Sequence, residues 1–475
     1  MPALSPRSVV VAALLMAMFM AAMEATVVAT VMPTVIADLG GLGLYGWVGA
    51  SYLLASTVTV PLYGKLADRR GRKPVLLLGI ALFLLGSLAS GLSPTIEALI
   101  VFRAVQGAGA GAVQPVVLTI LGDLFTPAER GKVQGFFGAM WGVAGISGPL
   151  LGGAIVAVAS WRWVFLLNLP FGLASALVLV RSYHEERRRP VSDAPLDLAG
   201  ATTVLLASLA VLLAASGVAP WILAPLAVAL LGLFVVVERR AADPVVPLPL
   251  LSRPLIATTT ASSLMLGATM NGVLNFLPLH VQGVLGAGPT ASGLVIAPML
   301  VGWPVASALT SRLLTRVGYR RPVRFGALLT LVGASAVVPL VASQSAPWMI
   351  GLAMLIFGFG MGLANTAILI GVQASVGWEQ RGVVTATTMF ARTMGGALGV
   401  GGLGAVLAGR LERSLDPNVV RALLDPELGV AALAMPGAVE ALGSALAPIF
   451  WGGALAAALA LGGALLHPPD PAPET

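Results

Sequence analysis

The stretch GKLADRRGRKPV, residues 64 to 75, is a short polar segment between two long apolar runs. Its single carboxylate, Asp68, is surrounded by five cations: Lys65, Arg69, Arg70, Arg72 and Lys73. Gly64 and Gly71 allow the backbone to turn sharply as it leaves the apolar runs. The segment therefore predicts a tight connection between two membrane-spanning helices, with its charges held at the membrane surface.

The composition of the chain places most of it in lipid. The 475 residues are 57% hydrophobic and only 10% charged, and the mean hydropathy is +0.94. Apolar runs of about 18 residues or more, each able to cross roughly 30 Å of hydrocarbon, recur along the whole length. The sequence therefore predicts an all-α integral membrane protein. The absence of cysteine excludes disulfides, thiol redox chemistry and cysteine-based metal sites.

Polar segments divide the chain into fourteen apolar runs, which we interpret as transmembrane helices. They are 9–36, 44–64, 74–92, 95–121, 132–158, 162–181, 197–217, 220–237, 255–282, 290–314, 322–342, 347–373, 383–408 and 440–466. The first run is too long for a secretory signal, which favours an uncleaved first helix. The closely spaced pair 197–217 and 220–237 fits either two spans or one re-entrant hairpin.

The distribution of Lys and Arg predicts the orientation, because cytoplasmic loops are enriched in them. With both termini inside, 21 of the 27 cations fall in inner segments and 4 in outer segments. Arg103 and Arg392 lie inside spans. This asymmetry explains the pI of about 10.3 without a nucleic-acid partner. We expect a multi-pass protein of a plasma membrane, and the excess of Arg over Lys favours a bacterial source.

Two weakly similar halves make up the chain. The Arg-Gly pairs at 130 and 381 lie 251 residues apart, and Gly107, Gly109 and Gly111 match Gly358, Gly360 and Gly362 at the same offset. Such repeats are typical of secondary transporters with a midplane site between the halves. We therefore predict these parts: a six-helix bundle at 1–181, a linker at 182–196, two additional helices at 197–237, a second linker at 238–254, and a six-helix bundle at 255–475 with an outer loop at 409–439.

Several motifs in order resemble those of the major facilitator superfamily. They are GKLADRRGRKPV at 64–75, RAVQGAGAGAVQP at 103–115, GVAGISGPLLGG at 142–153, WRWVFLLNLPFG at 161–172 and EATVVATVMPTV at 24–35. With fourteen spans, the whole chain resembles the fourteen-helix drug:proton antiporter family. The resemblance implies the major facilitator fold, two six-helix bundles plus two extra central helices, and proton-coupled efflux of lipophilic, cationic drugs by alternating access.

The resemblance also implies a gating loop. Asp68 would meet the start of the matching helix near Val383, where a helix N-terminus favours an anion, and Arg72 would pair with Asp123. The full set implied is Gly64, Asp68, Arg69, Gly71, Arg72, Lys73, Asp123 and Arg130. The simpler alternative is a loop that only fixes the topology. The antiporter motif would comprise Gly142, Gly148, Pro149, Gly152 and Gly153, although close helix packing alone accounts for these residues.

Glu24 is the only acidic residue well inside any predicted span. It lies roughly 22 Å and 18 Å of helix from the two ends of its span, close to the midplane. Burial disfavours a charged carboxylate unless a cation neutralises it, so a proton and a cationic substrate would compete for this group. Arg103 lies about 12 Å into its span, where a charged side chain normally faces the protein interior, and the resemblance implies that it takes part in proton coupling. The alternatives are a protonated glutamate that only packs and an arginine that only clamps backbone carbonyls.

The family usually has Asp at position 24, so the identity of the substrate does not follow from the resemblance. We expect small lipophilic substrates to contact residues facing the centre of the fold. The candidates are Met20, Met23, Glu24, Gln114, Trp141, Asn271, Asn275, Trp303 and Asn365. The alternative for the methionines is simple packing.

No enzyme chemistry is evident in the sequence. His184, His280 and His467 are too scattered for a metal site, and no phosphate-binding loop GxxxxGK[ST] occurs. We expect no cofactor and no metal, a monomer, and an ion gradient as the source of energy. Two other functions remain open: a narrow-specificity exporter of a metabolite, lipid or siderophore with the same fold, and a non-transporting membrane receptor or scaffold.

Overall fold

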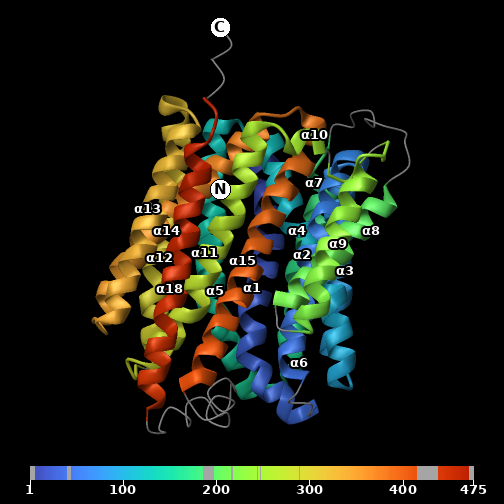
Figure 1. The fold of residues 1–475 in the computed structure, drawn as a ribbon. Helices are drawn as coiled ribbons and strands as arrows, with labels where there is room; N and C mark the ends of the chain where they lie inside the picture. The colour runs from blue at the N-terminus through green and yellow to red at the C-terminus, as the bar shows by residue number, and fades with distance from the viewer. Residues whose placement is uncertain are drawn as a thin grey trace, which may run out of the picture. The chain divides into compact units, whose positions relative to one another are not determined.

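A computed structural model describes residues 6–39, 44–185, 197–215, 218–242, 244–246, 248–287, 289–414 and 437–469. Every regular element in these ranges is a helix (Figure 1). The first helices are α1 Pro6–Leu39, α2 Tyr45–Arg70, α3 Arg72–Gly91, α4 Ile96–Leu124, α5 Pro127–Val158, α6 Arg162–Leu166 and α7 Asn168–Ser182. They are followed by α8 Leu198–Ala215, α9 Pro220–Glu238, α10 Leu248–Leu251, α11 Pro254–Gly283, α12 Pro289–Val317, α13 Arg320–Ala342, α14 Pro347–Ala374, η2 Trp378–Gln380, α15 Arg381–Ser414 and α18 Ala438–Leu465.

The predicted apolar runs form helices. Each of the fourteen predicted runs coincides with a helix, the sixth being divided into α6 and α7 at Leu167. Within the described residues, 12 helices are long and apolar enough to cross a membrane, and α2 and α5 are not among them. The all-helical membrane class is therefore confirmed, while fourteen spans remain a prediction. The pair α8 and α9 forms two separate helices of 18 and 19 residues, each about 27 Å or more in length.

Local sequence signals set the beginnings of these helices. Thr95 caps α4 by accepting a hydrogen bond from the backbone N–H of Ala98 at 3.3 Å. Pro127 occupies the first turn of α5, and Glu129 accepts a hydrogen bond from the backbone N–H of Thr126 at 2.9 Å. Gly71 joins α2 to α3 with φ of 97°, a conformation that favours glycine. The tight connection predicted for residues 64–75 is confirmed.

Two compact units divide the chain. The first comprises Met1–Leu209, Ala229–Leu251 and Val372–Phe390, and the second Ala210–Val228, Ser252–Gly371 and Ala391–Thr475. The first unit thus includes the end of α14 and the beginning of α15. The predicted outer loop lies mostly at 415–436, outside the described residues, and α15 continues to Ser414, beyond the predicted end of its span at 408. The predicted domain boundaries remain a prediction.

Glycines of α4 and α14 allow close helix packing inside each unit. In the first unit, a side chain at Gly107 would meet the backbone of Tyr52 on α2, and one at Gly109 would meet the backbone of Phe83 on α3. In the second unit, Gly358 approaches the backbone of Met299 on α12, and Gly360 that of Thr330 on α13. The two sets of glycines, 251 residues apart, therefore make equivalent contacts. This equivalence supports the internal repeat seen in the sequence.

We predict that Gly109→Ala destabilises the protein by about 1–3 kcal/mol, because the new methyl group would overlap backbone atoms of Phe83 and Gly79 on α3. The measurement is the thermal unfolding midpoint of purified protein. Gly232→Ala on α9 is the matched control, since no atom lies within 4 Å of the added carbon. Equal midpoints for the two variants would contradict the close α3–α4 packing.

Candidate functional site

Glu24 of α1 forms a buried ion pair with Arg103 of α4, inside the first unit. Each residue is 2% exposed. Glu24 Oε1 accepts a hydrogen bond from Arg103 Nη1, and its Oε2 accepts one from Asn168 Nδ2 at 2.5 Å. Both carboxylate oxygens therefore have a hydrogen-bond donor, and the glutamate is closed to solvent in this structure.

A small polar network supports the ion pair. Asn168 Nδ2 also donates to Ser87 Oγ at 3.0 Å, and Ser87 Oγ donates to the carbonyl of Phe165 at 2.7 Å. On the other side, Arg103 Nη1 donates to Gln106 Oε1 at 2.8 Å. These contacts connect five helices, α1, α3, α4, α6 and α7. The orientation of Glu24 therefore depends on groups from several elements rather than on α1 alone.

Arg103 has further contacts that stabilise its charge. Its Nε donates to the carbonyl of Val48 at 3.3 Å, and its guanidinium carbon lies 4.4 Å from the centroid of the Tyr52 ring. A cation over an aromatic face is stabilised by the ring quadrupole. The guanidinium thus has a carboxylate, an amide oxygen, a backbone carbonyl and an aromatic face around it. It can keep partners even when Glu24 loses its charge.

The ion pair changes the expectation for Glu24. The sequence predicts a lone carboxylate that binds either a proton or a cationic substrate. In this structure the cation that neutralises it is Arg103 of the same chain. Removing one member of a buried pair typically costs 3–5 kcal/mol, because the other charge is left uncompensated. Sequence reasoning did not single out Asn168, Ser87 or Tyr52. The isolated Asn168 within the apolar stretch 161–172 was the available signal.

The second site joins the end of α2 to the beginning of α15. Asp68, 6% exposed, accepts hydrogen bonds from the backbone N–H groups of Gly382 at 2.9 Å and Val383 at 2.7 Å. A helix N-terminus favours an anion in this position. Gly64 allows the approach, since a side chain there would meet Ala386 and the Gly382 carbonyl. The contact near Val383 implied by the resemblance is therefore present. We call this contact the latch.

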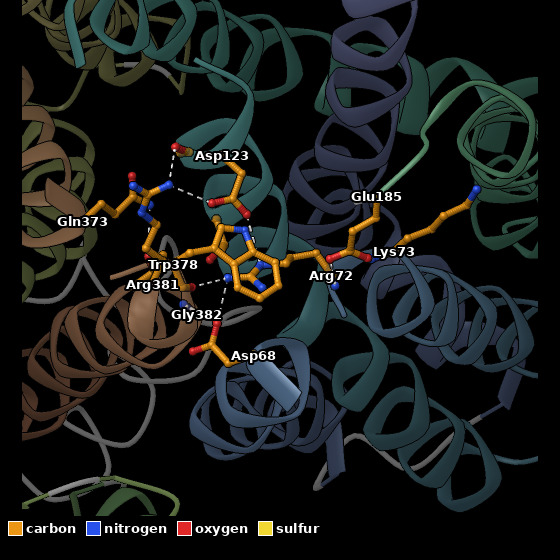
Figure 2. Close-up of polar contacts among 12 residues, drawn as sticks. Asp68, Arg72, Lys73, Asp123, Glu185, Gln373, Trp378, Arg381 and Gly382 are labelled. Atoms are coloured by element: carbon orange, nitrogen blue, oxygen red, sulfur yellow. Dashed lines mark hydrogen bonds and ion pairs between the residues drawn. The ribbon is translucent and has the colours of Figure 1, made fainter. Parts of the chain in front are cut away.

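Arg72 ties the latch to α4 (Figure 2). Its Nη2 donates to Asp68 Oδ1 at 3.0 Å, and its Nε lies 3.1 Å from Asp123 Oδ2. The side chain is fully buried, and its guanidinium lies 3.6 Å from the centroid of the Trp378 ring. Arg381 completes the cluster by donating to Asp123 Oδ1 at 3.0 Å. The Arg72–Asp123 pair implied by the resemblance is present, whereas sequence reasoning missed Arg381 and Trp378.

Arg130 and Gln373 extend the same network. Arg130 donates to the carbonyls of Phe125, at 2.9 Å, and Gly122. Gln373 Nε2 donates to the Leu118 carbonyl at 3.1 Å. Arg381 also donates to the Gly122 carbonyl, at 3.2 Å. The two Arg-Gly motifs of the repeat, at 130 and 381, therefore both place an arginine at the C-terminal end of α4. Gln373 was not predicted from the sequence.

Glu185, another residue that the sequence did not single out, covers the turn at Gly71. Its carboxylate accepts hydrogen bonds from the backbone N–H groups of Arg72 at 2.7 Å and Lys73 at 3.0 Å (Figure 2). Lys73 Nζ donates to the carbonyls of Val180 at 2.9 Å and Tyr183 at 2.6 Å. The end of α7 is therefore attached to the beginning of α3. Arg69 is half-buried at the end of α2.

Burial of the latch carboxyl makes it sensitive to pH. Burial raises the pKa of Asp68 from 3.8 to about 7, although Arg72 and the two backbone N–H groups act in the opposite direction. When the latch opens, the Asp68 carboxyl group enters water and regains its ordinary pKa. At a pH between 3.8 and about 7, closing the latch therefore takes up a proton. Proton uptake by Asp68 therefore stabilises the closed latch relative to the open one. This stabilisation is fully present at low pH and is lost as the pH rises through about 7.

The antiporter-motif residues of α5 lie mostly in helix packing. Gly142 and Gly148 are buried, and a side chain at Gly152 would lie 3.4 Å from Val27 of α1. Gly153 is exposed, with no atom within 4 Å of an added side chain. The side chain of Pro149 lies outside the described residues. These positions favour the packing interpretation, and a role in the direction of transport remains a proposal.

The candidate substrate-contacting residues are divided between the two units. In the first, Met20 and Met23 are buried, Met23 in an apolar cluster with Val27, and Gln114 and Trp141 are half-buried. Their positions in this structure favour packing for the methionines.

In the second unit, three candidate amides are held by their own helices. Asn271, Asn275 and Asn365 donate to the backbone carbonyls one turn back at 3.2, 2.9 and 3.0 Å. Asn275 is exposed and Trp303 is half-buried. Contact of any of these residues with substrate stays a prediction.

A helical membrane protein with repeated halves, a buried midspan ion pair and a charged latch has the construction of a secondary transporter. Residues 14–400 match the model of the Major Facilitator Superfamily. This match covers most of the chain, which therefore belongs to the Major Facilitator Superfamily. The family resemblance inferred from the motifs is confirmed.

Similar proteins include named drug transporters. The chain is 33% identical to the multidrug transporter protein MdtP of Bacillus subtilis over 425 residues, covering 88% of this chain and 78% of that protein. It is also 33% identical to multidrug resistance protein 3 of Bacillus subtilis, covering 78% and 74%.

A solved structure supports the fold. The structure of the human organic anion transporter MFSD10 matches with a TM-score of 0.64 and 17% identity, covering 96% of this chain and 100% of that one. At this level of identity the likeness establishes the fold alone.

We predict that lowering the pH from about 8 to about 5 increases the population with a closed latch, because Asp68 takes up a proton on closing. The chain has no cysteine, so spin labels at Arg70→Cys and Glu379→Cys report the separation of α2 from the start of α15 without background labelling. Asp68→Asn should reduce the pH dependence and leave only the part due to Asp123, whose pKa burial also raises. A distance distribution independent of pH in the labelled protein, or the same pH dependence in Asp68→Asn, would contradict this linkage.

Proposed function

We propose that this protein is a proton-coupled antiporter that exports lipophilic, cationic drugs from the cytoplasm by alternating access. The buried Glu24–Arg103 pair is the observation that carries the proposal. A charged pair in the middle of a membrane span is costly and usually marks an ion pathway. The similarity to proteins named as multidrug transporters supports drugs as the substrates.

The proton-coupled step follows from the charges of the pair. When Glu24 accepts a proton it becomes neutral and no longer balances Arg103. The guanidinium is then held by Gln106, the Val48 carbonyl and the Tyr52 ring, which are all already within contact. Asn168 would keep a hydrogen bond to the neutral carboxyl, since a protonated carboxyl still accepts. Protonation thus exchanges an ion pair for an unbalanced cation, and this favours a rearrangement of α1 against α4.

The latch is a second set of contacts that must change during transport. We place the end of α2 and the start of α15 on the cytoplasmic side, as the distribution of Lys and Arg indicates. Opening that side requires Asp68 to leave the N–H groups of Gly382 and Val383, and Arg72 to leave Trp378. The present structure then represents the state with the cytoplasmic latch closed. Entry of one proton down a potential of 100 mV supplies about 2.3 kcal/mol toward breaking such contacts.

We predict that Glu24→Gln abolishes proton-driven export while the protein still inserts into the membrane. Glutamine keeps the size and hydrogen-bonding capacity of the side chain but cannot exchange a proton. The measurement is export of a lipophilic cationic dye from proteoliposomes under a pH gradient. Glu97→Gln, at an exposed acid in the first turn of α4, is the control and should retain export. Undiminished export by Glu24→Gln would refute the assigned role.

We predict that Asp68→Asn lowers turnover by roughly tenfold or more, with little change in substrate affinity. Asparagine has only one acceptor oxygen, so it cannot accept from Gly382, Val383 and Arg72 as the carboxyl group does, and no substrate contact is changed. Turnover is measured in proteoliposomes and affinity by equilibrium binding to purified protein. Glu440→Gln, at an exposed acid in the first turn of α18, is the control. An equal loss of affinity and turnover would argue against a latch.

A panel of substrates distinguishes broad from narrow specificity. Export of many unrelated lipophilic cations, each bound weakly, supports the multidrug proposal. A single tightly bound metabolite, lipid or siderophore would instead indicate the narrow-specificity exporter, with the same proton coupling at Glu24.

A further inference from the structure

Arg392 is a second arginine inside a membrane span, and neither the ion pair nor the latch uses it. It lies in α15, 11 residues after the helix begins at Arg381, about 16 Å along the axis. A charged side chain at such a depth costs at least about 2.5 kcal/mol and normally faces a partner or a water-filled space. Its retention therefore requires a compensating interaction.

The guanidinium of Arg392 has no hydrogen bond, ion pair or aromatic contact with any described residue. Arg72 and Arg103 differ, since each has a carboxylate and an aromatic ring against it. The Arg392 side chain is half-buried, and its nitrogens are absent from the set of sealed polar atoms. The charge is therefore within reach of a water-sized molecule.

The second unit has no carboxylate to neutralise this cation inside a span. No Asp or Glu occurs between Asp243 and Glu379, so α11, α12, α13 and α14 contain none. On α15 itself, the next acid is Glu412, 20 residues further on and about 30 Å away along the helix. The acid of α18, Glu440, is in its first turn. A counter-ion for Arg392 must come from outside the helices of its own unit.

Arg392 begins a polar stripe where α15 packs against α11. A side chain at Gly267 of α11 would meet the backbone of Arg392, and one at Gly396, a turn beyond Arg392, would meet the amide of Asn271. Asn275, a further turn along α11, is exposed on the second unit. Residues four apart lie on the same helix face. Arg392 and the two asparagines therefore occupy successive positions along this seam, in a region of otherwise apolar helices.

The internal repeat indicates that packing does not require a cation here. The position equivalent to Arg392, at the offset of 251 residues, is Trp141 of α5, a neutral side chain. The two halves share the close-packing glycines of α4 and α14 but not this charge. The arginine is thus a difference between the halves, as expected for a group that acts on a ligand.

We infer that Arg392 is an anion-binding subsite for the substrate, which takes the carboxylate of an acidic or zwitterionic amphipathic compound. A planar guanidinium matches a carboxylate through two parallel hydrogen bonds. The amides of Asn271 and Asn275, each of which donates one hydrogen bond to its own helix, keep further hydrogen-bonding capacity at one and two helical turns beyond the position of Arg392. This inference rests on the proposed export function and extends its substrates beyond simple cations.

The test compares a xanthene dye that carries a free carboxylate with the methyl ester of the same dye. Equilibrium binding of both to purified protein in lipid nanodiscs is measured by fluorescence anisotropy. Wild type should bind the acid more tightly than the ester. Arg392→Gln should weaken binding of the acid dye by roughly tenfold or more and leave binding of the ester dye unchanged, because only the acid dye loses a charge-assisted contact. Arg410→Gln, at an exposed position of the same helix, is the control and should change neither.

Equal weakening of acid and ester by Arg392→Gln would overturn the subsite and assign the arginine a structural role. If Arg392→Gln does not fold, the wild-type preference decides: binding of the ester as tightly as the acid also overturns the inference. Arg392→Lys, which keeps the charge, should preserve part of the preference for the acid. Failure of the wild type to export either dye in proteoliposomes would count against the proposed function, whereas the binding ratio tests the subsite separately.

Discussion

A carboxylate and a guanidinium can stay charged inside a membrane span only while each neutralises the other. Glu24 and Arg103 meet this condition, with every oxygen of the carboxylate hydrogen-bonded and the arginine set against Tyr52. Because the charges balance as a pair, a single proton on Glu24 upsets the balance of the whole network on α1, α3, α4, α6 and α7. The proposed coupling therefore depends on a change of net charge at one buried place, and Asn168 and Gln106 decide how the two charges are held before and after it.

The latch obeys the same rule at the end of the helices. Asp68 and Asp123 are balanced by Arg72 and Arg381, and the N-terminus of α15 supplies two further donors. Each of these side chains has more than one partner, so the cluster is a shared network rather than a set of separate pairs. Glu185 attaches the end of α7 to the same turn, through the backbone N–H groups of Arg72 and Lys73.

Much of this architecture could be predicted from the sequence. The length of the apolar runs predicted the helices, and the glycines that repeat at an offset of 251 residues predicted two related halves. That these glycines of α4 and α14 pack against neighbouring backbones was found only in the structure. The contacts of Asp68 with Val383 and of Arg72 with Asp123 followed from the family motif. The pairing of Glu24 with Arg103 did not, because the two lie 79 residues apart and nothing in either stretch indicates which faces meet. Asn168, Gln373 and Trp378 were missed for the same reason, as isolated polar or aromatic residues whose partners only the fold supplies.

The central claim is that Glu24 exchanges a proton while Arg103 stays charged, and infrared difference spectroscopy tests it most directly. Acidifying purified protein should produce the band of a protonated carboxyl, which substrate then diminishes, and Glu24→Gln should lack this band. A band of equal size in Glu24→Gln, or a Glu24 that stays ionised when substrate and proton are exchanged, would contradict the account.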